Sequence, residues 1–250
     1  MIKLIELTKR FGAFAAVDHV NLEIEPGTIF AFLGTNGAGK TTTIRMMTGV
    51  LQPTSGTVEV FGYDIQKNPI EAKFQMGVIP DRPYLYGKLT GREFLQFMAD
   101  LYRVERRIAT QRIDELLEVF GLREWQHDLI DGYSHGMKQR LLMCAAQVHN
   151  PRVLVVDEPM VGLDPRGAKL LKDTFRAKAD AGLTIFMSTH SLSVAEEVAD
   201  HLAIIQRGKI VASGTLDDLY ARARSESSDL EEVFLQIISE SDAGDEKEVL

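Results

Sequence analysis

The sequence has little cysteine, no long apolar run and no excess of positive charge, and each shortage excludes a class of protein. Its single cysteine, Cys144, lies in an apolar segment, which excludes disulfides and cysteine-based metal sites and favours a place in the core. No apolar run approaches the roughly 18 residues that cross a bilayer, and residues 1–4 lack the apolar core of a signal peptide. We therefore expect a cytosolic chain without a membrane span of its own.

The charge balance excludes another class. The formal net charge is −8, whereas nucleic-acid-binding domains usually present a basic face to the phosphate backbone. Nucleic acid is therefore not expected as a partner. The hydrophobic content of 45% is that of an ordinary globular protein, so 250 residues can bury one large core or two modest ones.

A glycine-rich octapeptide at 34–41 carries the strongest functional signal. It fits the phosphate-loop pattern G-x-x-x-x-G-K-[ST], follows an apolar run at 29–33 and precedes a segment at 42–48 that can start a helix. Backbone N–H groups and the positive helix end would face phosphate, Lys40 would reach the β- and γ-phosphates, and the Thr41 hydroxyl would hold Mg²⁺. The alternative is a glycine-rich turn. The residues predicted to contact ATP here are Gly34, Thr35, Asn36, Gly37, Ala38, Gly39, Lys40, Thr41 and Thr42.

Hydrophobic patterning predicts an α/β fold. Half-exposed antiparallel strands are indicated by alternating runs at 2–7, 17–24 and 57–60. Parallel strands covered on both faces are indicated by uniformly apolar runs at 29–33, 153–156 and 184–187. We therefore expect a P-loop NTPase core with a mainly parallel sheet and an N-terminal antiparallel β-subdomain.

Helical periodicity replaces strand signals between about 89 and 150, which predicts an inserted α-helical subdomain. Its helices are expected at 93–102, 108–120 and 137–149. Further on, the pattern predicts a hairpin of 202–205 with 209–212 and a helical extension within 213–238, formed by 216–222 and 230–238. Residues 239–250 are acidic and poor in aromatics, which predicts a disordered tail.

Two adjacent carboxylates, Asp157 and Glu158, follow the apolar run at 153–156. Ligands of open α/β sheets usually bind where strands end, and the segment has the form of a Walker B motif. Asp157 would lie beside Mg²⁺, and Glu158 could orient or deprotonate the attacking water. An Asp-Glu pair after a strand is often only a surface turn, but the preceding phosphate loop favours the functional interpretation.

A second phosphate-binding helix start is predicted at 133–140. Ser134 can cap the helix, and Gly136 leaves its amides approachable. Together with the two Walker elements, Asp164 and His190, this segment makes the chain similar to the ATP-binding subunit of an ABC transporter. The segment corresponds to that family's L-S-G-G-Q signature, of which only Ser134 and Gly136 match. Its form is similar to signatures of ABC-2-type exporters.

The resemblance runs from Phe11 to about Phe234 and implies roles for single residues. It places Phe11 where an aromatic ring stacks on adenine, although a lone phenylalanine is more often a core residue. It implies that Asp164, within Gly162 to Pro165, lies in the D-loop, and that His190 donates a hydrogen bond to the γ-phosphate. Residues 1–238 are thereby predicted to form the ATP-binding domain.

One position departs from the family pattern. Asp81 stands in the Q-loop where the family normally has glutamine, and it brings a negative charge but no N–H donor. Asp81 could coordinate the metal through water, or it could only shape the loop. Both interpretations stay open at this point.

The resemblance also implies partners. A head-to-tail dimer would enclose two Mg·ATP, with Ser134 and Gly136 of one copy facing the phosphate loop of the other. Transport would require separate transmembrane permease subunits, which would hold the chain at the inner face of the cell membrane. Residues 84–86 are either a docking surface for that permease or an apolar patch covered by the chain itself. The alternative function is a soluble scaffold or assembly ATPase without a membrane partner.

Overall fold

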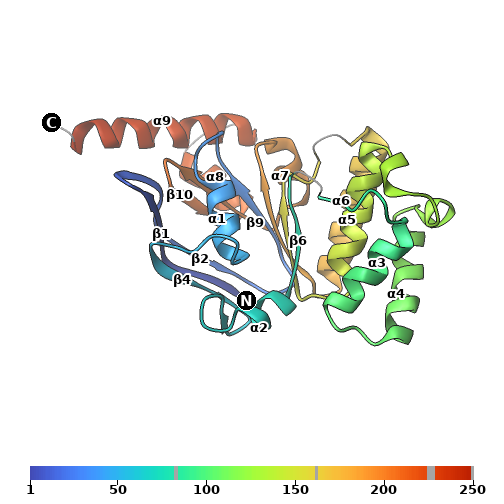
Figure 1. The fold of residues 1–250 in the computed structure, drawn as a ribbon. Coiled ribbons are helices and arrows are strands. Elements are labelled where there is room, and N and C mark those ends of the chain that lie inside the picture. The colour runs from blue at the N-terminus through green and yellow to red at the C-terminus, as the bar shows by residue number, and fades with distance from the viewer. Residues whose placement is uncertain (82–83, 161–162, 224–228, 249–250) are drawn as a thin grey trace.

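The computed structural model describes residues 1–81, 84–160, 163–223 and 229–248, and it consists of two sheets and a separate block of helices (Figure 1). The strands are β1 (Ile2–Phe11), β2 (Phe14–Ile24), β3 (Ile29–Leu33), β4 (Ser55–Val60), β5 (Tyr63–Asp64), β6 (Met76–Ile79), β7 (Val153–Asp157), β8 (Thr184–Thr189), β9 (His201–Gln206) and β10 (Lys209–Gly214). The helices are α1 (Lys40–Met47), α2 (Pro69–Phe74), α3 (Gly91–Leu101), α4 (Arg106–Val119), α5 (His135–Gln147), α6 (Pro165–Asp180), α7 (Leu192–Val198), α8 (Leu216–Ala223) and α9 (Leu230–Glu248), with short 3-10 turns at Arg123–Trp125 and Ile130–Gly132.

The larger sheet has the strand order β10-β9-β3-β8-β7-β6. Its strands run parallel from β9 to β6, and only β10 is antiparallel to its neighbour. Because side chains alternate across a strand, Phe30 and Phe32 face one hydrophobic core while Ile29, Ala31 and Leu33 face the other. The prediction of a mainly parallel, doubly covered sheet is confirmed.

The smaller sheet, β2-β1-β4-β5, is antiparallel throughout. It packs with α1 against the Phe30 face of the larger sheet, and its inward side chains Val17 and Val58 are fully buried. This confirms the predicted antiparallel subdomain. The β1–β2 hairpin extends beyond the predicted strands, however, so that Phe11 and Phe14 become cross-strand partners at its end.

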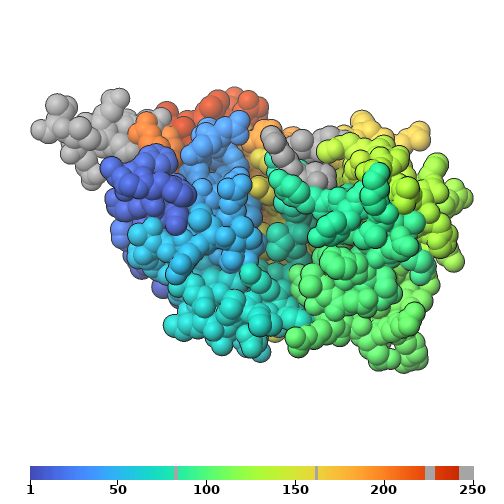
Figure 2. Space-filling model, in the orientation of Figure 1, coloured from blue at the N-terminus to red at the C-terminus, as the bar shows by residue number. Residues whose placement is uncertain are grey.

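The predicted helical block is formed by α3, α4 and α5, whose bounds differ from the prediction by one or two residues at each end. α3 begins with a capping box in which the Thr90 hydroxyl accepts from Glu93 N at 3.2 Å and Thr90 N donates to a Glu93 carboxylate oxygen at 2.8 Å. In Figure 2 the block is the green lobe beside the blue and cyan N-terminal sheet.

The block joins the larger sheet where α5 lies directly on β6. A Cβ added to Gly77 in β6 would lie 2.1 Å from the carbonyl oxygen of Ala146 in α5, so only glycine permits this approach. β6 itself was not predicted as a strand. Its four residues are too few to show a period.

The C-terminal segment differs from the prediction. α9 is anchored by the buried side chains of Leu230, Val233 and Ile237, and it continues to Glu248, through residues for which the sequence predicts disorder. Glutamate, lysine and alanine in 240–248 are good helix formers, which allows an anchored helix to continue. Residues 249–250 lie outside the described chain. Within the described residues, no helix is long and apolar enough to span a bilayer.

Candidate functional site

The phosphate-loop segment connects β3 to α1, as the sequence predicts. The helix begins at Lys40 after Gly39, whose φ of +116° is disfavoured for any residue with a side chain. A Cβ at Gly39 would also lie 2.6 Å from the carbonyl oxygen of Ala16. Gly39 at the N-cap has no side chain, and no other described side chain caps this helix, so its first amides are available to bind an anion.

Lys40 points its ammonium back into the loop. Its Nζ donates to the carbonyl oxygens of Gly34 at 2.7 Å and Thr35 at 3.2 Å. Burial lowers the pKa of Lys40, and the nearby carboxylates of Glu158 and Asp157 oppose that effect. A buried ammonium held by two loop carbonyls is positioned to exchange those contacts for phosphate oxygens.

Asp157 lies at the end of β7 and is almost fully buried. It accepts a hydrogen bond from the Ser188 hydroxyl, and the Thr41 hydroxyl lies 3.4 Å from its other oxygen. Burial raises the pKa of Asp157, the Ser188 hydrogen bond opposes this, and the negative charges of Glu158 and Asp81 add to it. The carboxylate therefore lies where a cation would be strongly favoured.

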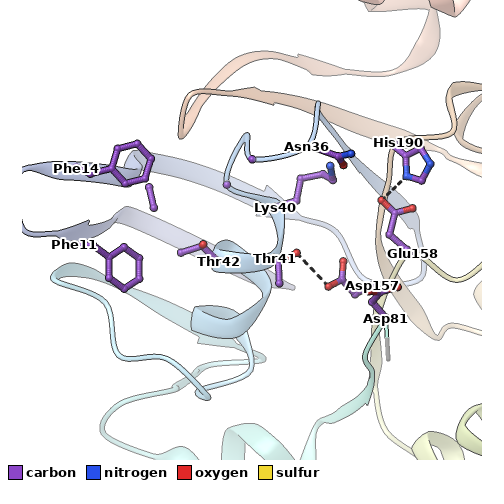
Figure 3. Close-up of a pocket in the computed structure, with 13 residues that line it drawn as sticks. Phe11, Phe14, Asn36, Lys40, Thr41, Thr42, Asp81, Asp157, Glu158 and His190 are labelled. Atoms are coloured by element: carbon purple, nitrogen blue, oxygen red, sulfur yellow. Dashed lines mark hydrogen bonds and ion pairs between the residues drawn. The ribbon is translucent and has the colours of Figure 1, made fainter. Parts of the chain in front are cut away.

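Glu158 follows in a left-handed backbone conformation, with φ of +50°. This turn brings its carboxylate to 2.9 Å from Nδ1 of His190, which comes directly after β8. The parallel register pairs Asp157 with Ser188, so the ends of β7 and β8 meet at one sheet edge. A carboxylate and an imidazole are thus held together beside Lys40 (Figure 3).

These residues line one cavity of about 480 Å³, which Figure 3 shows from the aromatic end to the carboxylate end. Asp81 lies beside Asp157 at the carboxylate end. The predicted site residues that line the cavity are Phe11, Asn36, Gly37, Gly39, Lys40, Thr41, Thr42, Asp81, Asp157, Glu158 and His190. Gly34, Thr35 and Ala38 belong to the loop but do not line the cavity.

The other predicted residues lie elsewhere. Ser134, Gly136 and Asp164 line a separate cavity of about 360 Å³ that shares no residue with the first. Ser134 caps α5 by accepting from Met137 N at 3.2 Å, and Asp164 caps α6 by accepting from Gly167 N at 2.7 Å. Gly162 of the predicted D-loop lies outside the described residues.

Sequence reasoning assigned no role to Phe14 or Ser188. Phe14 lines the first cavity beside Phe11, and Ser188 donates to Asp157. A signal for Ser188 was present, because it directly follows the predicted parallel strand at 184–187 and lies two residues before His190. Phe14 had no comparable signal, since its place depends on how far the hairpin extends.

The oxygen donors of the first cavity suit a magnesium ion. Thr41 and Asp157 offer hard oxygen ligands close together, which is the donor type that Mg²⁺ prefers. In the described part of the chain, no group of three or more His, Cys, Asp or Glu residues could hold a metal alone. The remaining ligands would therefore have to include water or phosphate oxygens, as is usual for Mg²⁺ at nucleotide sites.

Comparisons with known proteins agree with this geometry. A family model described as "ABC transporter" matches residues 17–161, and one described as "AAA domain, putative AbiEii toxin, Type IV TA system" matches residues 127–196. The bacitracin transport ATP-binding protein BcrA of Bacillus licheniformis is 42% identical over 90% of this chain and 72% of its own length. A solved structure of an ATP binding subunit of an ABC transporter superposes with a TM-score of 0.90, at 30% identity, covering 95% of this chain and 99% of that one.

A longer relative also matches. The probable multidrug ABC transporter ATP-binding protein YbhF of Escherichia coli (strain K12) is 38% identical over 97% of this chain. The chain spans only 42% of that relative's length. The chain therefore belongs to the ABC transporter family, whose ATP-binding domains hydrolyse ATP.

Proposed function

We propose that this chain binds Mg·ATP in the cavity of about 480 Å³ and that its ATP hydrolysis powers a separate membrane permease that exports its cargo. The proposal rests on the observation that Lys40, Asp157 and Glu158 all line that one cavity. The named relatives, one a bacitracin transport protein and one a probable multidrug transporter, support export.

Each side chain has a role in this proposal. The loop amides and Lys40 bind the phosphates, Thr41 and Asp157 hold Mg²⁺, and Mg²⁺ supplies neutralisation of the charge that develops on the phosphates. Glu158 orients or deprotonates the attacking water, because its carboxylate lies at the strand end beside the ammonium.

His190 and Asp81 have supporting roles. Nδ1 of His190 lies 2.9 Å from the Glu158 carboxylate, and a ring N–H of His190 donates to the γ-phosphate when nucleotide is bound. Asp81 reaches the metal through water, an arrangement supported by its place beside Asp157. The side chain of His190 is 59% exposed, which leaves it accessible to a ligand.

A second copy of the chain completes the site in this proposal. Ser134, Gly136 and Asp164 line their own cavity, so in a single copy they do not reach a nucleotide bound at Lys40. A head-to-tail pair brings the capped start of α5 to the γ-phosphate of its partner, where a helix N-terminus favours negative charge. Closure then depends on the triphosphate, and hydrolysis removes the bridge.

Exposed aromatic residues after β6 support the proposal that a permease is a partner of this chain. Tyr84 is 85% and Tyr86 is 60% exposed, and the Tyr86 ring packs edge-on against exposed Phe97 at 5.6 Å. Leu85 turns inward and packs on the core. Tyr84, Tyr86 and Phe97 therefore form the proposed docking patch, which would hold the chain at the inner face of the membrane.

In this proposal residues 1–238 form the ATP-binding domain. The helical block of about 89–150 is inserted in it, and 213–238 are its C-terminal extension. The soluble scaffold alternative finds no support among the relatives, whose names refer to transport.

The sharpest test replaces Glu158 with glutamine. Glu158→Gln keeps the shape of the side chain but removes its basicity, so it should bind Mg·ATP, lose turnover and accumulate closed dimers detectable by light scattering. Glu124→Gln, at an exposed position of the helical block, should behave as wild type. Rapid turnover in Glu158→Gln would refute the role of Glu158, and a variant that stays monomeric with saturating Mg·ATP, alone and with its permease, would refute the dimer.

A further inference from the structure

Two exposed phenylalanines end the β1–β2 hairpin. Phe11 is 54% and Phe14 is 65% exposed, although burying an aromatic side chain is among the largest apolar gains available to a protein. Exposed apolar side chains gathered at a cavity mark a surface that a ligand covers. We therefore expect a ligand to cover these two side chains at this end of the cavity.

The hairpin register directs both rings into the same space. Phe11 and Phe14 are cross-strand partners, and side chains of directly paired residues project from the same face. Both line the nucleotide cavity together with Ala16. Figure 3 shows the two rings at one end, Asp157 and Glu158 at the other, and Lys40 between them.

The Phe11 ring has one face already occupied. The ammonium of Lys9 lies 5.3 Å from its centroid and is held there by donating to the carbonyl oxygen of Gln52 at 2.7 Å. One face of Phe11 is thus left for a flat ligand. Phe14, across the hairpin end, supplies a second aromatic surface for that ligand.

We infer that Phe14 is a base-contacting residue, so that the base of the nucleotide lies against both Phe11 and Phe14. The inference rests on the proposed function, since the phosphates must lie at Lys40 for the base to reach the aromatic end. The side chains at that end are apolar, with no charged group among Phe11, Phe14 and Ala16. Recognition by stacking tolerates any base, because every base has a π face.

The test compares ligands with and without a base. Equilibrium binding of ATP, GTP and inorganic tripolyphosphate, each with Mg²⁺, is measured for Phe14→Ala, Phe14→Leu and Phe14→Tyr. Phe14→Ala should raise the dissociation constants of ATP and GTP about tenfold and leave that of tripolyphosphate within about twofold. Phe14→Tyr should bind ATP and GTP as wild type does. The dissociation constants of Phe14→Leu should lie between those of wild type and Phe14→Ala.

Tyr63→Ala is the matched control, because Tyr63 is an exposed aromatic of the same sheet that does not line the cavity. It should leave all three ligands unchanged. Unchanged ATP binding in Phe14→Ala, or an equal loss for ATP and tripolyphosphate, would overturn the inference. Failure of the proposed function has a different signature: Lys40→Ala would then bind tripolyphosphate as well as wild type does.

Discussion

We expect a low pH to lower the free energy of unfolding through His149. This residue lies at the junction between the helical block and the larger sheet. Its ring stacks on Tyr102 with centroids 3.7 Å apart, and Nε2 lies 3.0 Å from the carbonyl oxygen of Met76 at the start of β6. Since a carbonyl only accepts, Nε2 carries the proton. Nδ1 is then a bare, buried nitrogen without a hydrogen-bond partner among the described residues.

Protonation of Nδ1 would create a buried cation without an acceptor. Burial lowers the pKa of His149 to about 4; the Met76 carbonyl opposes this, and the positive charge of Arg112 adds to the lowering. The unfolded chain takes up this proton near its ordinary pKa of about 6.5. The stabilising contribution of neutral His149 is therefore complete above about pH 6.5 and is lost as the pH falls towards about 4.

The size of this loss of stability follows from the thermodynamic linkage between proton binding and folding. Between about pH 7.5 and about pH 5, the difference between the two pKa values lowers the free energy of unfolding by about 2 kcal/mol. His149→Phe keeps an aromatic ring against Tyr102 and removes the titration, so its unfolding free energy should fall by about 2 kcal/mol less over that range. A lost hydrogen bond to Met76 adds an offset of about 1 kcal/mol that does not depend on pH.

Urea unfolding followed by circular dichroism at several pH values measures both terms. Carboxylates also titrate in this range, so the comparison is between variants rather than between pH values alone. His127→Phe, at an exposed position, is the control and should retain the wild-type slope. If wild type and His149→Phe lose stability in parallel from pH 7.5 to pH 5, the assignment of a buried neutral imidazole is wrong.

Substitutions at Gly77 and Asp81 test the packing and the departure from the family pattern. Gly77→Ala should destabilise the fold by about 2 kcal/mol or more, because its Cβ would meet the Ala146 carbonyl oxygen, whereas Gly132→Ala, which has open space, should be near neutral in urea unfolding. Asp81→Asn removes a negative charge beside Asp157 and should weaken Mg²⁺ binding, so a higher Mg²⁺ concentration should be needed for half-maximal ATP hydrolysis. Unchanged ATPase and unchanged coupling to the permease in both Asp81→Asn and Asp81→Ala would dismiss the role of Asp81.

The larger sheet could be predicted because burial on both faces leaves an unambiguous signal. β3 has the predicted bounds of 29–33, since all five residues are buried and each face of the strand meets a different core. The proximity of Glu158 and His190 could also be predicted from the sequence. Both follow parallel strands, and the carboxyl ends of parallel strands share one edge of the sheet.

The aromatic end of the cavity could not be predicted in the same way. The register of β1 with β2 shifts between Leu4 and Leu7, between Leu7 and Lys9, and between Lys9 and Arg10. Each irregularity breaks the alternation of apolar and polar residues on which strand prediction depends. The strand was therefore expected to end at residue 7, and Phe14 was expected to lie outside any strand.

The charge of the nucleotide cavity explains why one chain should not suffice for the reaction. Among the described residues that line this cavity, Lys40 supplies one ammonium beside the carboxylates of Asp81, Asp157 and Glu158, and the proposed ligand is a triphosphate. Like charges confined at close range repel unless cations or N–H donors intervene. In the proposed site, a divalent ion at Thr41 and Asp157 would supply one part of that compensation, and the uncapped amides of α1 would supply another.

The Ser134-capped start of α5 is a further set of amides in the described chain, and it lies in a cavity apart from the first. In the proposed head-to-tail dimer, a second copy would bring those amides to the triphosphate. We therefore expect dimerisation to offset the remaining repulsion and to be favoured most when the γ-phosphate is present.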